Sequence, residues 1–173
     1  MAGILAVNFW AGMKVIDTRK ETFGRNLALI ESKFQDEHKK AFGNDTNVSK
    51  YGYPDMGNNL YGDLLPYKDW VKINNAQRCH EFGYEHAVVL IPNAFISAFR
   101  LPKFTTVMLA VYLGLRLVHV TGWHTYRGHN SAFVAEEFMK LCVVILVFGA
   151  MTSSVMMLGY RLPLFIGKRL PFL

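Results

Sequence analysis

The chain has 173 residues, of which 51% are hydrophobic and only 18% charged, and its formal net charge is +6. A charged fraction below the ~25% of ordinary soluble domains, in a chain of single-domain length, indicates a membrane protein. The positive charge does not indicate a nucleic-acid partner, because the Arg and Lys residues lie singly beside apolar runs, as membrane-interface anchors do.

Residues 2–16 form the first apolar segment, interrupted by Asn8 and Lys14. The segment lacks the basic start and the small-residue cleavage motif of a signal peptide. We therefore predict an uncleaved first membrane span here. A helix lying in the interface is the alternative.

A polar insertion covers residues 17–70. Its apolar residues recur at helical spacing and predict an amphipathic helix over residues 22–42, which Gly43 ends. The expected buried edge of this helix comprises Phe23, Leu27, Ile30 and Phe34. The remainder is rich in Gly, Pro, Tyr and Asn and predicts an ordered loop.

Three further helices are predicted after the insertion: a second helix over residues 71–99, a third span over 104–123 and a fourth over 133–160. The fourth contains 18 consecutive uncharged residues, Leu141–Leu158, nearly enough to cross a ~30 Å hydrocarbon layer. Pro92 lies inside the second helix, as membrane helices tolerate. Residues 161–173 are a tail. The expected fold is an all-α integral membrane protein, a four-helix transmembrane bundle with an extra amphipathic helix in the first loop.

Charged residues cluster on the second helix. Arg78, Glu81 and Glu85 share one face by i, i+3, i+7 spacing, at the mouth of an apolar stretch. Charges at such a position are costly, so they usually pair or bind a ligand. The simplest interpretation is an ion-paired helix start.

A second cluster lies on the third span, where Arg116, His119 and Trp123 share one face. Arg116 is deep enough in the span to need a partner or a water-filled cavity. We expect Glu85 or Glu81 on the neighbouring helix to be that partner, which would create one buried polar seam.

Metal and nucleophilic chemistry have little support in the sequence. The His and Glu residues show no metal-site spacing, and the two cysteines, Cys79 and Cys142, predict small buried residues. Haem ligation by His86 and His119 from facing helices is a further alternative.

Three motifs together resemble the MAPEG family, the membrane-associated proteins in eicosanoid and glutathione metabolism, and most closely its type-three microsomal glutathione S-transferases. They are Gln77-Arg78-Cys79-His80 with Glu85, the upstream YGYPDM at 51–56, and Arg116 followed by Gly122 and Trp123. The resemblance covers roughly residues 51–160. It implies a four-helix bundle that trimerises and binds glutathione between neighbouring subunits.

By this resemblance, Arg78, Glu85 and Arg116 are retained glutathione-site positions, while His119 and Trp123 replace tyrosines of the family. Phe82 replaces the family's Asn. Ser131 stands where related members place an Arg that stabilises the glutathione thiolate, and Arg127 and His129 nearby are the only candidate catalytic substitutes. A thiol with a pKa near ~8.5 needs a positive charge to become a nucleophile at neutral pH.

These departures favour a non-catalytic accessory subunit of a larger membrane assembly, for example a respiratory complex of the mitochondrial inner membrane. In that case it has no cofactor or metal, and its partners are the lipid bilayer and other membrane subunits. The alternative is an active microsomal-type glutathione transferase or peroxidase, which acts as a homotrimer on lipophilic substrates in the endoplasmic reticulum.

Overall fold

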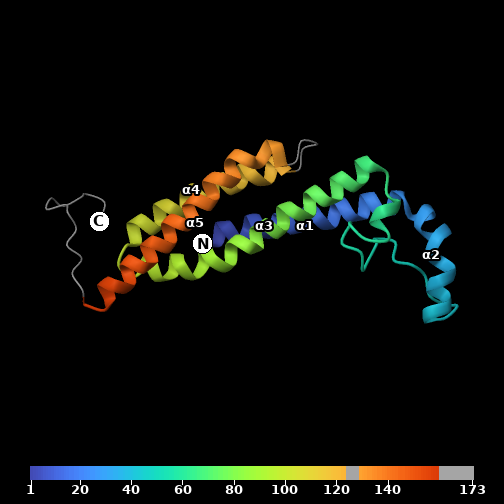
Figure 1. Ribbon diagram of the computed structural model, residues 1–173, viewed down its shortest axis with the longest axis horizontal. Coiled ribbons are helices and arrows are strands. Elements are labelled where there is room, and N and C mark those ends of the chain that lie inside the picture. The colour runs from blue at the N-terminus through green and yellow to red at the C-terminus, as the bar shows by residue number, and fades with distance from the viewer. Residues whose placement is uncertain (124–128, 160–173) are drawn as a thin grey trace.

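A computed structural model describes residues 1–123 and 129–159, and over these residues the chain is all-helical. Five α-helices and one short 3-10 helix follow each other along the chain (Figure 1). They are α1 (Ala2–Arg25), α2 (Leu27–Phe42), η1 (Gly62–Leu64), α3 (Tyr67–Ala98), α4 (Pro102–Trp123) and α5 (His129–Met157). The predicted helical class and the extra helix in the first loop are confirmed.

Helix α1 is longer than the predicted span over residues 2–16, because it continues through the polar residues to Arg25. The amphipathic helix accordingly begins at Leu27 rather than at residue 22. The break lies at Asn26, whose side-chain amide donates to the Thr22 carbonyl at 2.8 Å and to Asp69 Oδ2 at 2.9 Å. A contact with α3 therefore fixes the point where the chain turns.

Helix α2 packs through its predicted apolar stripe against the C-terminal end of α1 and the N-terminal end of α3. Phe23 and Ile30 are fully buried in a cluster with Ile73. Two loop residues, Val48 and Leu65, are also buried in this cluster. The partly buried residues packed against it are Leu27, Phe34, Tyr61 and Leu64. Gly43 ends α2 with a φ of +105°, a conformation that glycine adopts without a steric penalty.

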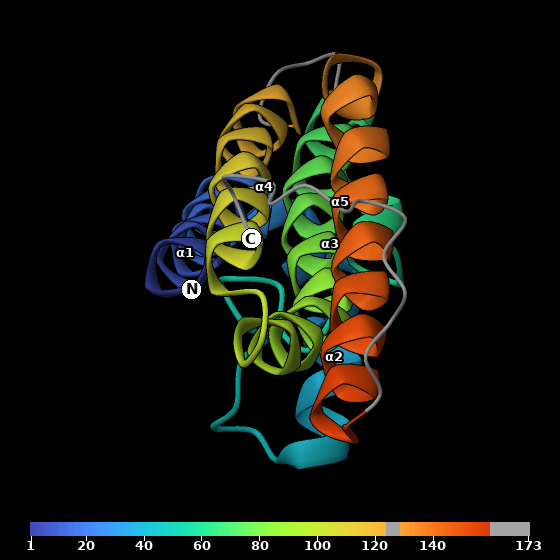
Figure 2. The same cartoon turned by 90° about the vertical axis from the view of Figure 1, so that its left-hand side faces the viewer.

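Helix α3 is the central element of the bundle. It packs against α1, α4 and α5, and it runs unbroken through Pro92. A three-residue connection leads into α4, where Pro102 occupies the first helical position and needs no backbone donor. Helices α3 and α4 thus form an antiparallel hairpin, and α4 and α5 together make a layer that covers one half of α3 (Figures 1 and 2).

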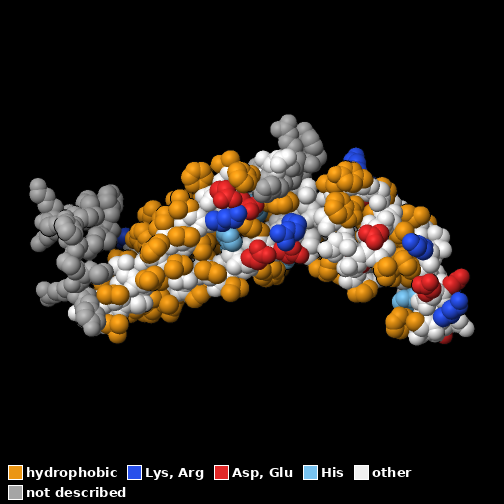
Figure 3. All heavy atoms as spheres, in the orientation of Figure 1, with side chains coloured by type: hydrophobic (Ala, Val, Ile, Leu, Met, Phe, Trp, Pro, Cys, Tyr) orange, Lys and Arg blue, Asp and Glu red, His pale blue; other side chains and the backbone are white. Residues whose placement is uncertain are grey.

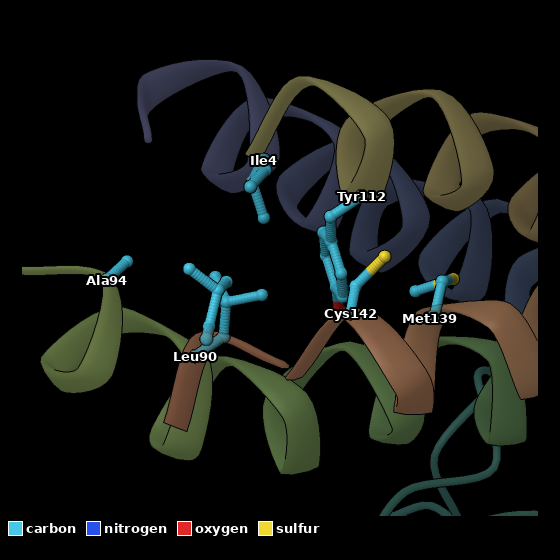
Figure 4. Close-up of a cluster of buried hydrophobic side chains, with 7 residues drawn as sticks. Ile4, Leu90, Ala94, Tyr112, Met139 and Cys142 are labelled. Atoms are coloured by element: carbon cyan, nitrogen blue, oxygen red, sulfur yellow. The ribbon is translucent and has the colours of Figure 1, made fainter. Parts of the chain in front are cut away.

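The bundle core is apolar and draws between one and three residues from each of the four long helices. Leu90 and Ala94 of α3 meet Tyr112 of α4, and the remaining buried members are Ile4, Met139, Cys142 and Leu146 (Figure 4). Both cysteines are free and buried, as predicted. Gly149 lets α5 approach α4 closely, since an added Cβ would lie 2.7 Å from the ring of Phe104 on α4.

Helices α4 and α5 are long and apolar enough to cross a membrane. Only 28% of the most apolar stretch of α4 and 33% of that of α5 is buried, whereas a core helix of a soluble protein would be mostly buried. Apolar side chains accordingly cover much of the visible surface over these helices (Figure 3). Helices α1 and α3 do not meet the same criterion, so the structure supports two candidate spans rather than four.

Candidate functional site

The candidate site is a buried polar cluster centred on Arg116 of α4, which has no exposed surface. Each nitrogen of its guanidinium group has a protein partner. Nε donates to Asn8 Oδ1 at 3.0 Å, Nη2 donates to the Cys79 carbonyl at 2.9 Å, and Nη1 lies 2.7 Å from Nδ1 of His119. Arg116 thereby connects α1, α3 and its own helix.

Gly83 makes room for this guanidinium group on the face of α3. A Cβ atom at this position would lie 2.4 Å from Nη2 of Arg116 and 2.7 Å from Oδ1 of Asn8. Asn8 is also tied to α3, because its amide donates to the Gly83 carbonyl at 3.2 Å. The arginine side chain therefore lies directly on the backbone of α3, where no other residue type would leave space.

His119 extends the cluster toward the end of α4. Trp123 Nε1 lies 2.9 Å from Nε2 of His119, and a carboxylate oxygen of Glu136 on α5 lies 3.8 Å from the same nitrogen. A neutral imidazole has one acceptor nitrogen, so His119 can accept from Arg116 or from Trp123 but not from both at once. Glu136 also pairs with Lys140, at 2.9 Å.

Phe82 closes the cluster on the side of α3. Its ring stacks on His119 with 4.5 Å between ring centroids, and it lies 4.0 Å from the ring of His86. The position that resembles a family Asn therefore holds an apolar surface against the imidazole. It offers no hydrogen bond to a polar ligand.

The predicted pairing of Arg116 with Glu85 or Glu81 is wrong. Glu85 is exposed on α3, and Glu81 forms its ion pair with Arg78 at 2.9 Å. The neutral acceptors Asn8 and the Cys79 carbonyl take the place of an acid, because they lie next to the guanidinium group on α1 and α3, which both pack against α4.

The structure therefore brings together only part of the predicted site. Arg116, His119 and Trp123 form one connected group, whereas Arg78 is exposed and points to its own helix neighbour. Arg127 lies outside the described residues. His129 opens α5, but its side chain is also outside the described part. The pairing of Arg78 with Glu81 agrees with the simplest interpretation of that face.

Sequence reasoning missed Asn8, Gly83 and Glu136 as members of this cluster. Asn8 carried a signal, since it is one of two polar residues in the apolar segment 2–16. Nothing local indicated which helix it would face. Within the described residues no group of three His, Cys, Asp or Glu side chains is placed to hold a metal ion.

Comparison with known proteins gives no match to a family model, a curated protein or a solved structure. The resemblance to the MAPEG family therefore rests on the three sequence motifs alone. The geometry shows which groups the arginine binds. A fully buried arginine with a partner on every nitrogen stabilises helix packing, and a ligand would have to displace those partners to bind it.

Proposed function

We propose that this chain is a non-catalytic, MAPEG-like membrane subunit that contributes helix packing and partner contacts to a larger membrane assembly. One observation carries the proposal. Arg116, the position that would hold glutathione in the resemblance, has no exposed surface and is bonded to Asn8, the Cys79 carbonyl and His119.

Glutathione would find few partners in this cluster. Its carboxylates would have to compete with internal acceptors that already meet the guanidinium group, and each buried group left unpaired costs ~1–3 kcal/mol. Phe82 fills the adjoining space and supplies neither donor nor acceptor. Arg78 is exposed and paired with Glu81, so it supplies no convergent second cation to the cluster.

The outer surface supports the second part of the proposal. Large apolar side chains are exposed on α4 and α5, among them Val107, Val118, Phe138 and Phe148. Lipid covers such a surface, and so does an apolar partner subunit. In the proposed arrangement all four long helices are embedded, with the α2 region outside the bilayer as a docking element. The mitochondrial inner membrane is the proposed location.

A thiolate titration tests the proposal against the enzymatic alternative. The purified chain in mild detergent would be titrated with glutathione, and the ultraviolet absorbance of the thiolate recorded alongside turnover of an aryl halide. We expect neither signal. A thiolate signal that disappears in an Arg116→Met variant and persists in Arg78→Met would overturn the non-catalytic proposal and favour the transferase.

Extraction from the native membrane provides the second test. A chain tagged at its own locus should migrate in a mild detergent as part of a large assembly of several different proteins. Migration as a homotrimer of this chain alone would contradict the accessory role.

A further inference from the structure

A groove of about 500 Å³ lies between α1 and α3, and Asn8 of the Arg116 cluster is one of its lining residues. Its α1 wall runs from Leu5 to Arg19, and its α3 wall runs from Gln77 to Ala87. The lining is mostly apolar along α1. Phe9 and Met13 of this wall are exposed, so the groove opens to the outside on their side.

Arg19 closes one end of the groove with an incompletely paired positive charge. The residue is only 2% exposed. One of its terminal nitrogens donates to the Asp55 carbonyl, and the guanidinium group lies 4.2 Å from the centroid of the Tyr53 ring. Nε and the second terminal nitrogen are buried and have no hydrogen-bond partner. A buried cation with two free donors is costly unless an anion completes its shell.

Gln77 adds a second unpaired group beside the same groove. Its side chain is 8% exposed, and its Oε1 atom is buried without a donor. The groove thus offers N–H donors from Arg19 and an acceptor from Gln77, followed by an apolar channel. That order of groups matches an amphiphile with an anionic, hydroxyl-bearing head.

The position of Arg19 relative to the candidate spans supports this assignment. Gly3 lies beside Leu113, Asn8 beside Arg116, and Ala11 packs with Val120, so α1 and α4 run in the same direction. Helix α4 ends at Trp123, and α1 continues beyond that level with α3 (Figure 1).

Arg19 therefore lies past the apolar end of α4, where a membrane-spanning α4 would place the lipid phosphates. Leu5 and Arg19 are 14 positions apart, which corresponds to roughly 21 Å of helix extending from that depth back into the apolar layer.

We propose that this groove binds an anionic membrane phospholipid, with its phosphate on Arg19, its head-group hydroxyl near Gln77, and an acyl chain along the apolar face of α1. The proposal does not depend on whether the chain is catalytic. Burial of each methylene of the chain would add to the affinity, and the charge on Arg19 would select anionic over zwitterionic heads.

Native mass spectrometry of the full chain in detergent tests the assignment. The delipidated protein would be titrated with phosphatidylglycerol and with phosphatidylcholine of the same acyl composition. We expect phosphatidylglycerol to bind about tenfold more tightly or better, because both lipids offer Arg19 a phosphate but only phosphatidylcholine carries a choline cation that the guanidinium group repels. Equal affinity for the two lipids would overturn the proposal.

Two variants separate the head from the tail. Arg19→Met should abolish the preference for phosphatidylglycerol, while Lys20→Met, which removes an exposed neighbouring charge, should retain it. Ala87→Trp fills the groove and should weaken both lipids with Arg19 intact. Because Arg19→Met is a change in a buried residue, its helical content and elution volume must match those of the parent.

Other occupants of the groove give distinct results. Inorganic phosphate that competes as well as phosphatidylglycerol would show that the tail is not held, and it would overturn the lipid assignment. A dimer of the chain that Ala87→Trp dissociates would assign the groove to a second copy instead.

Discussion

Replacing Gly83 with alanine should destabilise the bundle, although alanine is the better helix former. The new Cβ would lie 2.4 Å from Nη2 of Arg116 and 2.7 Å from Oδ1 of Asn8, so these atoms must move. Arg116 is fully buried, and its movement breaks the bonds to Asn8 and to the Cys79 carbonyl.

The magnitude follows from the bonds at risk. Hydrogen bonds to a charged group contribute ~1.5–3 kcal/mol each, and the gain in helix propensity offsets ~1 kcal/mol of their loss. If both bonds break, Gly83→Ala should lower the free energy of unfolding by about 2–5 kcal/mol. Gly114→Ala is the matched control, because no atom lies within 4 Å of its added Cβ. That variant should be neutral or stabilised by up to ~1 kcal/mol.

The assay is reversible unfolding in mixed detergent micelles, followed by circular dichroism. A double-mutant cycle with Asn8→Ala identifies the cause, since removal of the Asn8 side chain gives the guanidinium group space to move. The cost of Gly83→Ala should then fall by more than ~1 kcal/mol. Equal stability of Gly83→Ala and Gly114→Ala would refute the packing of Arg116 on α3.

Three further outcomes are expected. Burial raises the pKa of Asp55, but backbone N–H groups that donate to its carboxylate outweigh this effect, so its folded pKa is below the ordinary 3.8. The ionised Asp55 carboxylate should therefore contribute its full stability above pH 3.8, and this contribution should be lost as the pH falls through the lowered pKa. In a pH series of melting curves, Asp55→Asn should remove this acid dependence. The control variant Asp63→Asn, at an exposed residue, should keep it. Gly149→Ala should lower the melting temperature relative to Gly114→Ala, because its Cβ would meet an aromatic ring at 2.7 Å and a hydroxyl oxygen at 2.8 Å. Ser153→Ala removes a 2.8 Å hydrogen bond from α5 to an α3 carbonyl. In the micelle assay it should lower the free energy of unfolding by only ~0.6 kcal/mol. A decrease above ~2 kcal/mol would contradict the role of this contact as a simple interhelical hydrogen bond.

Local patterns in the sequence were sufficient for most of the helices. The apolar stripe of α2 and the apolar runs of α4 and α5 depend on residues a few positions apart, so periodicity and composition predict them. The end of α1 could not be predicted from local sequence, because residues 17–25 contain nothing that must break a helix. Its end is set by the contact of Asn26 with Asp69, 43 positions away.

The candidate site shows the same division more sharply. That Arg116 would be buried and would need partners followed from one cation within an apolar run. Which partners it has did not follow, because the Arg116–Asn8 bond joins residues 108 positions apart, and no feature of either segment specifies the other. The sequence by itself determined the helices, their apolar faces and the need to neutralise a buried charge. Only the packing of α1 against α3 and α4 decided that neutral amide and carbonyl oxygens meet the guanidinium group, since that packing alone sets which polar atoms come within bonding distance.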